Sequence, residues 1–475
     1  MSADNTAFKP LSSLRAQTRN LPNGKDSPSC LGDGGCSSAM TLRDGRVVRF
    51  GEIILPASKS ESNRALMMAA YGGFTPDFQN LSDSSDTRIL VKAISEIQSG
   101  NRVIDIADCG TAARFLTTFL ACREGEWLLT GTERMKQRPI GALVHALMGL
   151  GVDIQCAGKK GSLPLRIKGK PISGGKVSVE MSQSSQFASS LLLAAPMWPH
   201  GIELELTGSL NSMPYLDMTL ALMQHFGAKA ERNGRTVYVA PKPYHSRNFV
   251  VSSDWSATSY WYEMAALCED GEIVLRGHFA RRFDRLVDLK SPVLESVGKS
   301  ALEFVEKLES PQGDAIVAEW MKSLGVNTLS DKETLVLRKT SFDKKPLSFE
   351  FSLHPDLFPT MAAVCAGLQM EARFTGVSTL KLKESDRVET MREELSKIGA
   401  ELNCLGGKEL VLKPSEELPF HEKTTPLWFN SHDDHRVVMA LAPLAMKIGA
   451  VAFDHPEVVG KSYPSFWSDA RFLKQ

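Results

Sequence analysis

Residues 57–70 read "ASKSESNRALMMAA", in which a polar and charged cluster is followed by a run of small and apolar residues. A helix on a protein surface is apolar along one stripe and polar on the opposite face. After Arg64 this segment is apolar on nearly every side, which is typical of a helix covered from several directions. The stretch therefore predicts a helix that starts among charged residues and continues through a protein interior.

Five further segments have the same design, at residues 108–121, 182–196, 254–267, 354–368 and 432–446. Strand-like stretches that end at Gly or Asn turns, such as "GIELELTGSL" at 201–210, run between them. Amphipathic helices of a second kind end in "GA" or "GV", where glycine suits a C-terminal cap. The pattern predicts an α/β protein in which a strand–helix–strand–helix unit recurs roughly every 70 residues. Six such units suit two domains of three units each.

Length and composition narrow the class of protein. The chain has 475 residues, enough for two or more sizeable cores. Lys plus Arg and Asp plus Glu both number 55, so no overall charge attracts nucleic acid or an anionic membrane. No apolar run approaches the roughly 18 residues that a membrane span needs. The eight cysteines form no CxxC pair, which indicates reduced thiols in a cytoplasmic protein.

Two segments stand apart from the repeating pattern. Residues 1–46 are rich in Ser, Gly, Asn and Asp, lack periodicity and contain no apolar secretory segment, so we expect a disordered tail. Residues 280–309 lengthen one unit, and we expect them to form a mostly helical surface insertion.

Arginines recur at the starts of the expected helices. Arg64, Arg114, Arg387 and Arg436 fall in the first turn or two, and Arg138 precedes Pro139, whose ring suits a first helical position. A cation there opposes the helix dipole, and any one of them could be an ordinary surface ion pair. Five together favour a shared anion, because helix N-termini and guanidinium groups both bind phosphate or carboxylate. The sequence predicts a cleft where several helix starts converge on a polyanionic substrate.

Other polar residues at these positions have both a structural and a functional interpretation. The Ser and Gln residues of 58–60 and 184–186 are ordinary helix caps, and they would also suit a sugar-like phosphate. Glu384 lies between Lys383 and Arg387, where a carboxylate could cap a helix or exchange a proton with a reacting group. The "HDDH" at 432–435 offers two histidines, but no third ligand is evident and the following arginine would repel a cation. We therefore expect no metal and no cofactor.

Seven motifs in order make the sequence similar to the 5-enolpyruvylshikimate-3-phosphate synthase family. They are "LPASKSESNRAL" (55–66), "DCGTAAR" (108–114), "MKQRPIG" (135–141), "SSQF" (184–187), "MPYLDMT" (213–219), "KLKESDR" (381–387) and "DDHR" (433–436). The similarity runs from about Gly51 to Phe466 and is broken by the insertion. It implies a monomer with a two-domain inside-out α/β barrel of six βαβαββ units and an active site in the interdomain cleft. The first domain would comprise residues 47–57 and 252–475, and the second residues 58–251.

The resemblance also implies the reaction and its residues. The enolpyruvyl group of phosphoenolpyruvate would pass to the 5-hydroxyl of shikimate 3-phosphate, with Asp356, Glu384, Lys59 and Lys383 as catalytic residues. Shikimate 3-phosphate would contact Lys59, Ser60, Arg64, Ser184, Ser185, Gln186, Ser212, Tyr215, Asp356, Thr379 and Lys383. Phosphoenolpyruvate would contact Lys59, Gly110, Arg138, Gln186, Arg387, Arg436 and Lys461. Thr379 stands where many family members have Asn.

Two alternatives remain open from the sequence. UDP-N-acetylglucosamine enolpyruvyl transferases share the fold but use a loop cysteine as acid and a "KN" pair where this chain has "KS" at 59–60. A non-catalytic binding protein for phosphorylated metabolites would keep the Arg and Ser residues but could lose the acid. The presence of both Glu384 and Asp356 favours an enzyme.

Overall fold

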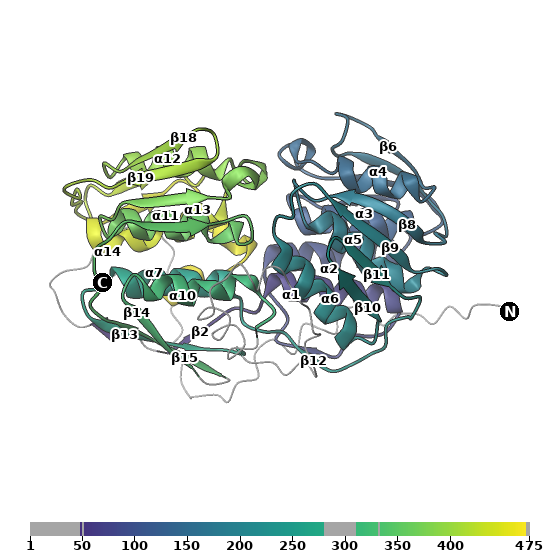
Figure 1. Ribbon diagram of the computed structural model, residues 1–475, viewed down its shortest axis with the longest axis horizontal. Coiled ribbons are helices and arrows are strands. Elements are labelled where there is room, and N and C mark those ends of the chain that lie inside the picture. The colour runs from purple at the N-terminus through teal and green to yellow at the C-terminus, as the bar shows by residue number, and fades with distance from the viewer. Residues whose placement is uncertain (1–47, 50–51, 280–309, 331–332, 472–475) are drawn as a thin grey trace.

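The computed structural model describes residues 48–49, 52–279, 310–330 and 333–471, so the expected tail and insertion lie outside the described residues. Buried apolar side chains form two separate cores. The 57–251 core runs from Ala57 to Val251. The 255–470 core runs from Trp255 to Ala470 and includes Ile53 and Leu55 from the N-terminal side. The two cores correspond to the two halves of the molecule in Figure 1.

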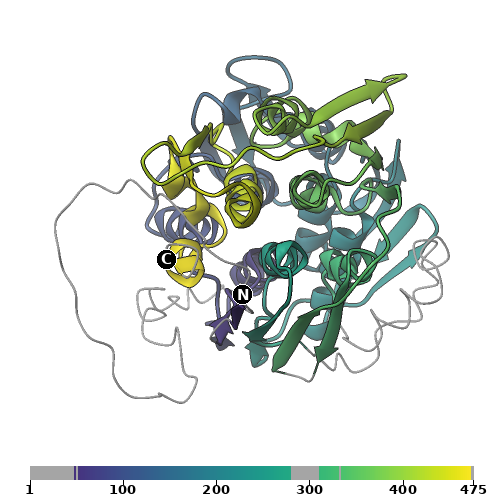
Figure 2. The same cartoon turned by 90° about the vertical axis from the view of Figure 1, so that its left-hand side faces the viewer.

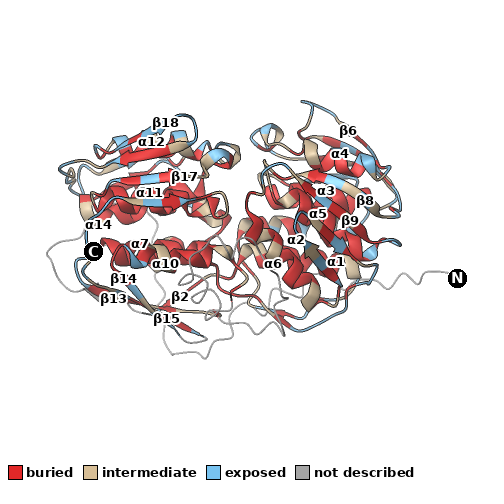
Figure 3. Cartoon of the chain, in the orientation of Figure 1, coloured by how far each residue is buried: buried red, intermediate tan, exposed pale blue. Residues whose placement is uncertain are grey.

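All six helices expected to be buried are present, three in each core. The 57–251 core contains α1 (Lys59–Gly72), α3 (Gly110–Ala121) and α5 (Gln186–Ala194). The 255–470 core contains α7 (Trp255–Leu267), α11 (Phe358–Gly367) and α13 (His435–Leu441). Every residue of α3 and of α7 is buried, as the red helices in Figure 3 show. These helices are apolar all round because other elements surround them.

Seven further helices lie within the described residues. They are α2 (Ser85–Gln98), α4 (Gly141–Gly149), α6 (Met213–His225), α10 (Val317–Lys322), α12 (Arg387–Ser396), α14 (Ala445–Ile448) and α15 (Phe466–Asp469). The expected glycine caps follow α4, α6, α10 and α12, where Gly151, Gly227, Gly325 and Gly399 have φ values of 87°, 93°, 78° and 78°. Only glycine adopts such angles without strain. The expectation that Pro139 begins a helix was wrong, because α4 begins at Gly141, after an extended Arg138 and the N-cap Ile140.

The strands form sheets on the outside of each core. Those of the 57–251 half are β3 (Phe78–Gln79), β4 (Val103–Asp105), β5 (Gly125–Thr130), β6 (Asp153–Cys156), β7 (Leu165–Gly169), β8 (Gly175–Glu180), β9 (Ile202–Thr207), β10 (Ala230–Asn233), β11 (Thr236–Val239) and β12 (Phe249–Val250). Those of the other half are β1 (Val48–Arg49), β2 (Ile53–Ile54), β13 (Gly271–Arg276), β14 (Val326–Ser330), β15 (Thr334–Lys339), β16 (Leu347–Glu350), β17 (Ala372–Thr375), β18 (Glu401–Leu405), β19 (Glu409–Lys413), β20 (Leu427–Phe429) and β21 (Val451–Phe453).

Three four-stranded sheets share one topology, with orders β4-β5-β7-β6, β8-β9-β11-β10 and β16-β17-β19-β18. In each, the first two strands are parallel and the other neighbours are antiparallel. The sheet of β13, β15 and β14 follows the same scheme, with β1 and β2 both parallel to β13. The pairs β3–β12 and β20–β21 are parallel and two-stranded. The mixed α/β class is therefore confirmed.

The buried helices pack against one another inside each core. Contacts join α3 to α5 and α5 to α6 in one half, and α11 to α13 and to α7 in the other. Figure 2 looks along several of these helices, which lie side by side with strands outside them. This arrangement leaves the helix ends, rather than their sides, free to face the other half. Among the described residues, no helix is both long and apolar enough to cross a bilayer.

One buried side chain opposes folding. Glu263 on α7 is fully buried, and neither of its carboxyl oxygens has a hydrogen-bond partner among the described residues. Burial raises the pKa of Glu263 well above its usual range. In the unfolded chain the carboxyl ionises above pH about 4.3. The free energy of unfolding is therefore highest below that pH. It declines as pH rises towards the folded-state pKa, because the carboxyl can ionise in the unfolded chain but not in the folded one.

We expect Glu263→Met to stabilise the protein increasingly with pH. The apolar side chain fills a similar volume and removes the ionisable group, so the gain should grow by about 1.4 kcal/mol per pH unit up to the folded-state pKa. Urea unfolding at pH 5 and pH 8 measures it. Glu126→Met, at an exposed position of β5, is the matched control. Equal gains at both pH values would show that Glu263 is not held neutral.

Candidate functional site

A cleft between the two halves collects the residues that the sequence singled out. The predicted site residues that line it are Lys59, Ser60, Arg64, Gly110, Arg138, Ser184, Ser185, Gln186, Ser212, Tyr215, Asp356, Thr379, Lys383, Glu384, Arg387 and Arg436. Lys461 lines an adjoining pocket, which shares Arg138 and Glu384 with the cleft. Its Nζ lies 3.3 Å from Oδ1 of Asp86, a cleft residue. The structure thus brings all the predicted residues together.

The starts of the buried helices position these side chains. Ser58 caps α1 by accepting from the N–H of Glu61, and Cys109 caps α3 by accepting from the N–H of Ala112. Asp434 caps α13 in the same way. Because the apolar part of each helix is fixed in a core, its polar first turn is held rigidly at the cleft. Free N–H groups at these helix starts attract anions.

Arg387 is the centre of an ion-pair network on the 255–470 side. Its Nε donates to Oδ2 of Asp434 at 2.8 Å, its Nη1 to Oδ1 of Asp356 at 3.0 Å, and its Nη2 to Oε2 of Glu384 at 2.9 Å. The side chain is 1% exposed and that of Asp434 is fully buried. Although burial favours the neutral form, these carboxylates raise the pKa of Arg387 above its usual range. A permanently charged guanidinium therefore holds both candidate catalytic carboxylates, Asp356 and Glu384.

Asp356 lies in the turn before α11 and accepts hydrogen bonds from four groups. They are Arg387, Arg436 Nη2 at 2.9 Å, Tyr215 Oη at 3.1 Å and Lys383 Nζ at 3.4 Å. Burial raises the pKa of Asp356, but Arg436, Lys383 and Arg387 together hold it well below its usual range. This carboxylate is ionised and can accept a proton from a bound hydroxyl.

Glu384 lies between two arginines from opposite halves of the molecule. Besides Arg387, its Oε1 accepts from Nη1 of Arg138 at 3.5 Å. Burial raises the pKa of Glu384, yet Arg138 and Arg387 hold it well below its usual range. The side chain is 16% exposed and faces the cleft. Glu384 is therefore a carboxylate that pairs with two cations.

A second ion-pair cluster lies where α1 and α2 start. Asp86 is held between Lys59 Nζ, at 2.9 Å, and Lys461 Nζ. Burial raises the pKa of Asp86, but Lys461 and Lys59 lower it below its usual value. Lys461 also pairs with Asp108. Asp86 thus positions Lys59 and Lys461, the two lysines expected to contact phosphoenolpyruvate. The sequence analysis did not identify Asp86, although it is an acidic residue in the first turn of a helix.

The remaining polar groups line the other part of the cleft. Arg64 donates to Thr219, to the carbonyl of Ser60 and to the carbonyl of Tyr215, at 2.7, 2.9 and 3.2 Å. Gln186 Nε2 donates to Oγ1 of Thr111 at 3.2 Å. Hydroxyl, amide and guanidinium groups in such a pocket suit a phosphorylated polyol.

Several further residues at the cleft were not predicted as site residues. Thr111, Gln183, Asn211 and His435 line it beside the predicted ones, as does Arg114, a helix-start arginine to which no substrate contact was assigned. His435 is buried, and neither ring nitrogen has a hydrogen-bond partner among the described residues. Burial, with Lys59 and Arg436 nearby, holds the pKa of His435 well below its usual range. Asp314 accepts from Tyr215 at 3.4 Å, and its proximity to this site has no signal in the sequence.

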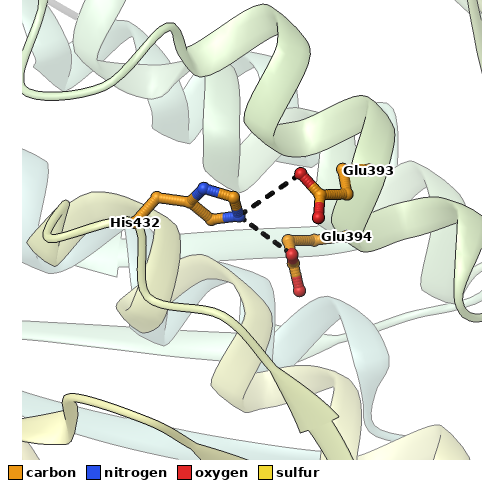
Figure 4. Close-up of side chains that lie close together, drawn as sticks. All are labelled: Glu393, Glu394 and His432. Carbon is orange, nitrogen blue, oxygen red and sulfur yellow. Dashed lines mark hydrogen bonds and ion pairs between the residues drawn. The ribbon is translucent and has the colours of Figure 1, made fainter.

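One acidic cluster outside the cleft resembles a metal site, but one of its two carboxylates is already paired with an ammonium group. Nε2 of His432 lies 2.9 Å from Oε1 of Glu394 and 3.9 Å from Oε2 of Glu393 (Figure 4). Oε2 of Glu394 accepts from Lys397 Nζ at 2.7 Å and from the N–H of Asn430 at 2.9 Å. These contacts tie the turn before α13 to α12, and we assign no ion to them.

Fold and site together define an enzyme of two halves, with a cleft of convergent cations, two carboxylates and hydroxyl-binding groups for small anionic substrates. A model of the EPSP synthase (3-phosphoshikimate 1-carboxyvinyltransferase) family matches residues 94–469. A 3-phosphoshikimate 1-carboxyvinyltransferase of Bacteroides fragilis is 39% identical over 420 residues, which cover 88% of this chain and 94% of that protein. One of Methanoculleus marisnigri is 30% identical over 435 residues, covering 87% and 94%. The chain belongs to the EPSP synthase family of enolpyruvyl transferases, which serves the shikimate pathway.

A structural comparison agrees on the fold. An EPSP synthase structure from Acinetobacter baumannii superposes with a TM-score of 0.65 at 18% sequence identity, covering 92% of this chain and 98% of that one. The family model and the two relatives confirm the resemblance stated from the motifs, and the chain is an enzyme of this family. The UDP-N-acetylglucosamine alternative is not favoured by these matches.

Proposed function

We propose that the protein transfers the enolpyruvyl group of phosphoenolpyruvate to the 5-hydroxyl of shikimate 3-phosphate, releasing phosphate. The observation that carries the proposal is the placement of Asp356 and Glu384 on one buried arginine, Arg387. Two carboxylates held on the same cation, at the edge of an anion-binding cleft, can divide the work of base and acid. The residue roles implied by the resemblance are part of this proposal.

The chemistry would proceed by addition and elimination. Glu384, once protonated, adds its proton to C3 of phosphoenolpyruvate while the 5-hydroxyl oxygen bonds to C2 and gives its proton to Asp356. The tetrahedral adduct then loses phosphate from C2, and the phosphate takes up the proton held by Asp356. The carboxylate of Glu384 removes a proton from C3, which restores the double bond. Arg138, Arg387, Arg436, Lys59 and Lys461 would neutralise the developing charge.

Glu384 must gain a proton before it can act. Its carboxylate pairs with Arg138 and Arg387, the same groups proposed to bind phosphoenolpyruvate. An anionic substrate that takes over these cations would leave Glu384 buried without its partners. Its pKa would then rise, because burial disfavours the charged form. Substrate binding would thus prepare the acid.

The finer features of the fold belong to the same proposal. The shared strand order supports six βαβαββ units in an inside-out barrel, with the two-stranded sheets as shortened units. The change of core between Leu55 and Ala57, and again between Val251 and Trp255, supports domains at 47–57 plus 252–475 and at 58–251. We also propose a cytoplasmic monomer.

The test is phosphate release from phosphoenolpyruvate by the purified protein, with and without shikimate 3-phosphate. Release that requires both substrates supports the proposal. Calorimetric binding of shikimate 3-phosphate without release would indicate a binding protein. Release with UDP-N-acetylglucosamine instead would assign the other transferase.

Gly110 offers a selective test of the phosphoenolpyruvate side. A Cβ there would lie 2.7 Å from Nη1 of Arg138 and 2.8 Å from Nη1 of Arg114, so Gly110→Ala must displace guanidinium groups. We expect the KM for phosphoenolpyruvate to rise about 10-fold, equivalent to ~1.4 kcal/mol, while the affinity for shikimate 3-phosphate is unchanged. Steady-state kinetics measure both.

Gly149→Ala is the matched control, because its Cβ would meet only Val177 at 3.8 Å. An unchanged KM for phosphoenolpyruvate in Gly110→Ala would remove Arg138 from that subsite.

A further inference from the structure

Arg134 makes an unusual contact across the cleft. It lies on the 57–251 side, at the start of a short 3-10 turn, and is exposed. Its Nε donates to the carbonyl of Glu384 at 2.8 Å, and its Nη2 donates to the carbonyl of Lys383 at 3.0 Å. Both acceptors belong to the 255–470 side. One guanidinium therefore holds two successive peptide groups of the opposite half.

The chemistry of this contact differs from that of a surface ion pair. Exposed ion pairs contribute little, because their charges are solvated and their side chains are free to move. Here the acceptors are main-chain carbonyls, and the rigid fork of a guanidinium fixes the direction of both. The peptide between Lys383 and Glu384 carries the proposed acid and its neighbouring lysine. Its orientation decides where both side chains point.

The same segment also holds the Glu384 side chain. Arg138 is four residues further along the chain and reaches Oε1 of Glu384 at 3.5 Å. Residues 134–138 thus contact both the main chain and the carboxylate of Glu384, and they can do so only when the two halves are close together. Other contacts also join the halves, among them the N–H of Ser212 to the carbonyl of Ser352 at 2.7 Å, Tyr215 with Asp356, and Lys461 with Asp86 and Asp108.

We propose that Arg134 is a positioning residue that couples the approach of the two halves to the orientation of Lys383 and Glu384. It need not touch substrate. When the halves separate, the two carbonyls lose their donor and the acid loses Arg138 at the same time. For its kinetic consequence the proposal rests on the proposed function, whereas its effect on compactness does not.

The test compares Arg134→Ala with Arg134→Lys and Lys136→Ala. Lys136 lies in the same turn and pairs with Glu133 of its own segment, so its removal deletes an equal charge without a contact across the cleft. We expect Arg134→Ala to lower kcat about 10- to 100-fold, since small misplacements of catalytic groups have effects of this size. Arg134→Lys, which lacks the fork, should be intermediate. Lys136→Ala should match the wild type.

Two further readouts separate positioning from folding. The Tm of Arg134→Ala should equal that of the wild type, because the side chain is exposed. Small-angle scattering of the protein alone, without added substrate, should show a larger radius of gyration for Arg134→Ala than for the wild type. Wild-type kcat in Arg134→Ala would overturn the proposal. If even the wild type released no phosphate, the proposed function would fail, and unchanged scattering in Arg134→Ala would then overturn the coupling separately.

Discussion

Glu384→Gln is expected to lower kcat for phosphate release by about 10³-fold, within the range typical of a lost general acid. Glutamine keeps the shape and can still fill the space between Arg138 and Arg387, but it has no acidic proton to give to C3. The cleft should survive, because Arg387 keeps Asp356 and Asp434 as partners. Rapid-quench and steady-state assays of phosphate release measure the effect.

Substrate binding distinguishes lost chemistry from a damaged site. Calorimetry should show that Glu384→Gln binds shikimate 3-phosphate within about twofold of the wild type, a difference below ~0.5 kcal/mol. The matched control is Glu389→Gln, an exposed acid in the first turn of α12 that pairs with Arg392. Near wild-type turnover in Glu384→Gln would exclude Glu384 as the acid.

Arg387→Met is expected to abolish measurable turnover and to destabilise the fold by about 3 kcal/mol or more. Arg387 and Asp434 are both buried, and removing one partner leaves an uncompensated charge in the interior. The same change removes the cation that holds Asp356 and Glu384 together and would bind the substrate anion. Urea unfolding and phosphate release measure the two effects separately.

A double variant separates these effects on one protein. Asp434→Asn keeps a side-chain oxygen to cap α13 but carries no charge, so Arg387→Met combined with Asp434→Asn should recover most of the lost stability. Turnover should stay absent, because the arginine proposed to bind the anionic substrate is still missing. Full stability in the single variant Arg387→Met would contradict the buried-pair argument. Restored turnover in the double variant would exclude Arg387 from the site.

Local sequence accounted for much of the fold and for the composition of the site. An all-round apolar pattern can be satisfied only by burial, so the segments at 57–70 and 108–121 identified α1 and α3 without tertiary information. Glycine after an amphipathic run likewise predicted the left-handed turn at Gly399. Arginines in the first turns of such helices are energetically unfavourable without an anion, which made Arg64 and Arg436 recognisable.

Other parts of the site had no local signal. Asp314 follows the 280–309 segment in an ordinary turn, and only folding brings it to Tyr215. Asp434 belongs to the "HDDH" stretch, and nothing in that stretch indicates its contact with Arg387, 47 residues away in the sequence. Arg134 and Glu384, whose carbonyl it contacts, are 250 residues apart in the sequence.

The sequence by itself determined which segments are buried, which glycines end the amphipathic helices, and which residue types would meet an anion. These properties depend on side-chain periodicity and on backbone angles that neighbouring residues set. The tertiary structure alone decided which carboxylate pairs with which cation, and hence that Glu384 and Asp356 are ionised on a shared arginine. Coulomb interactions and desolvation depend on distance through space, and the packing of two separate cores sets that distance.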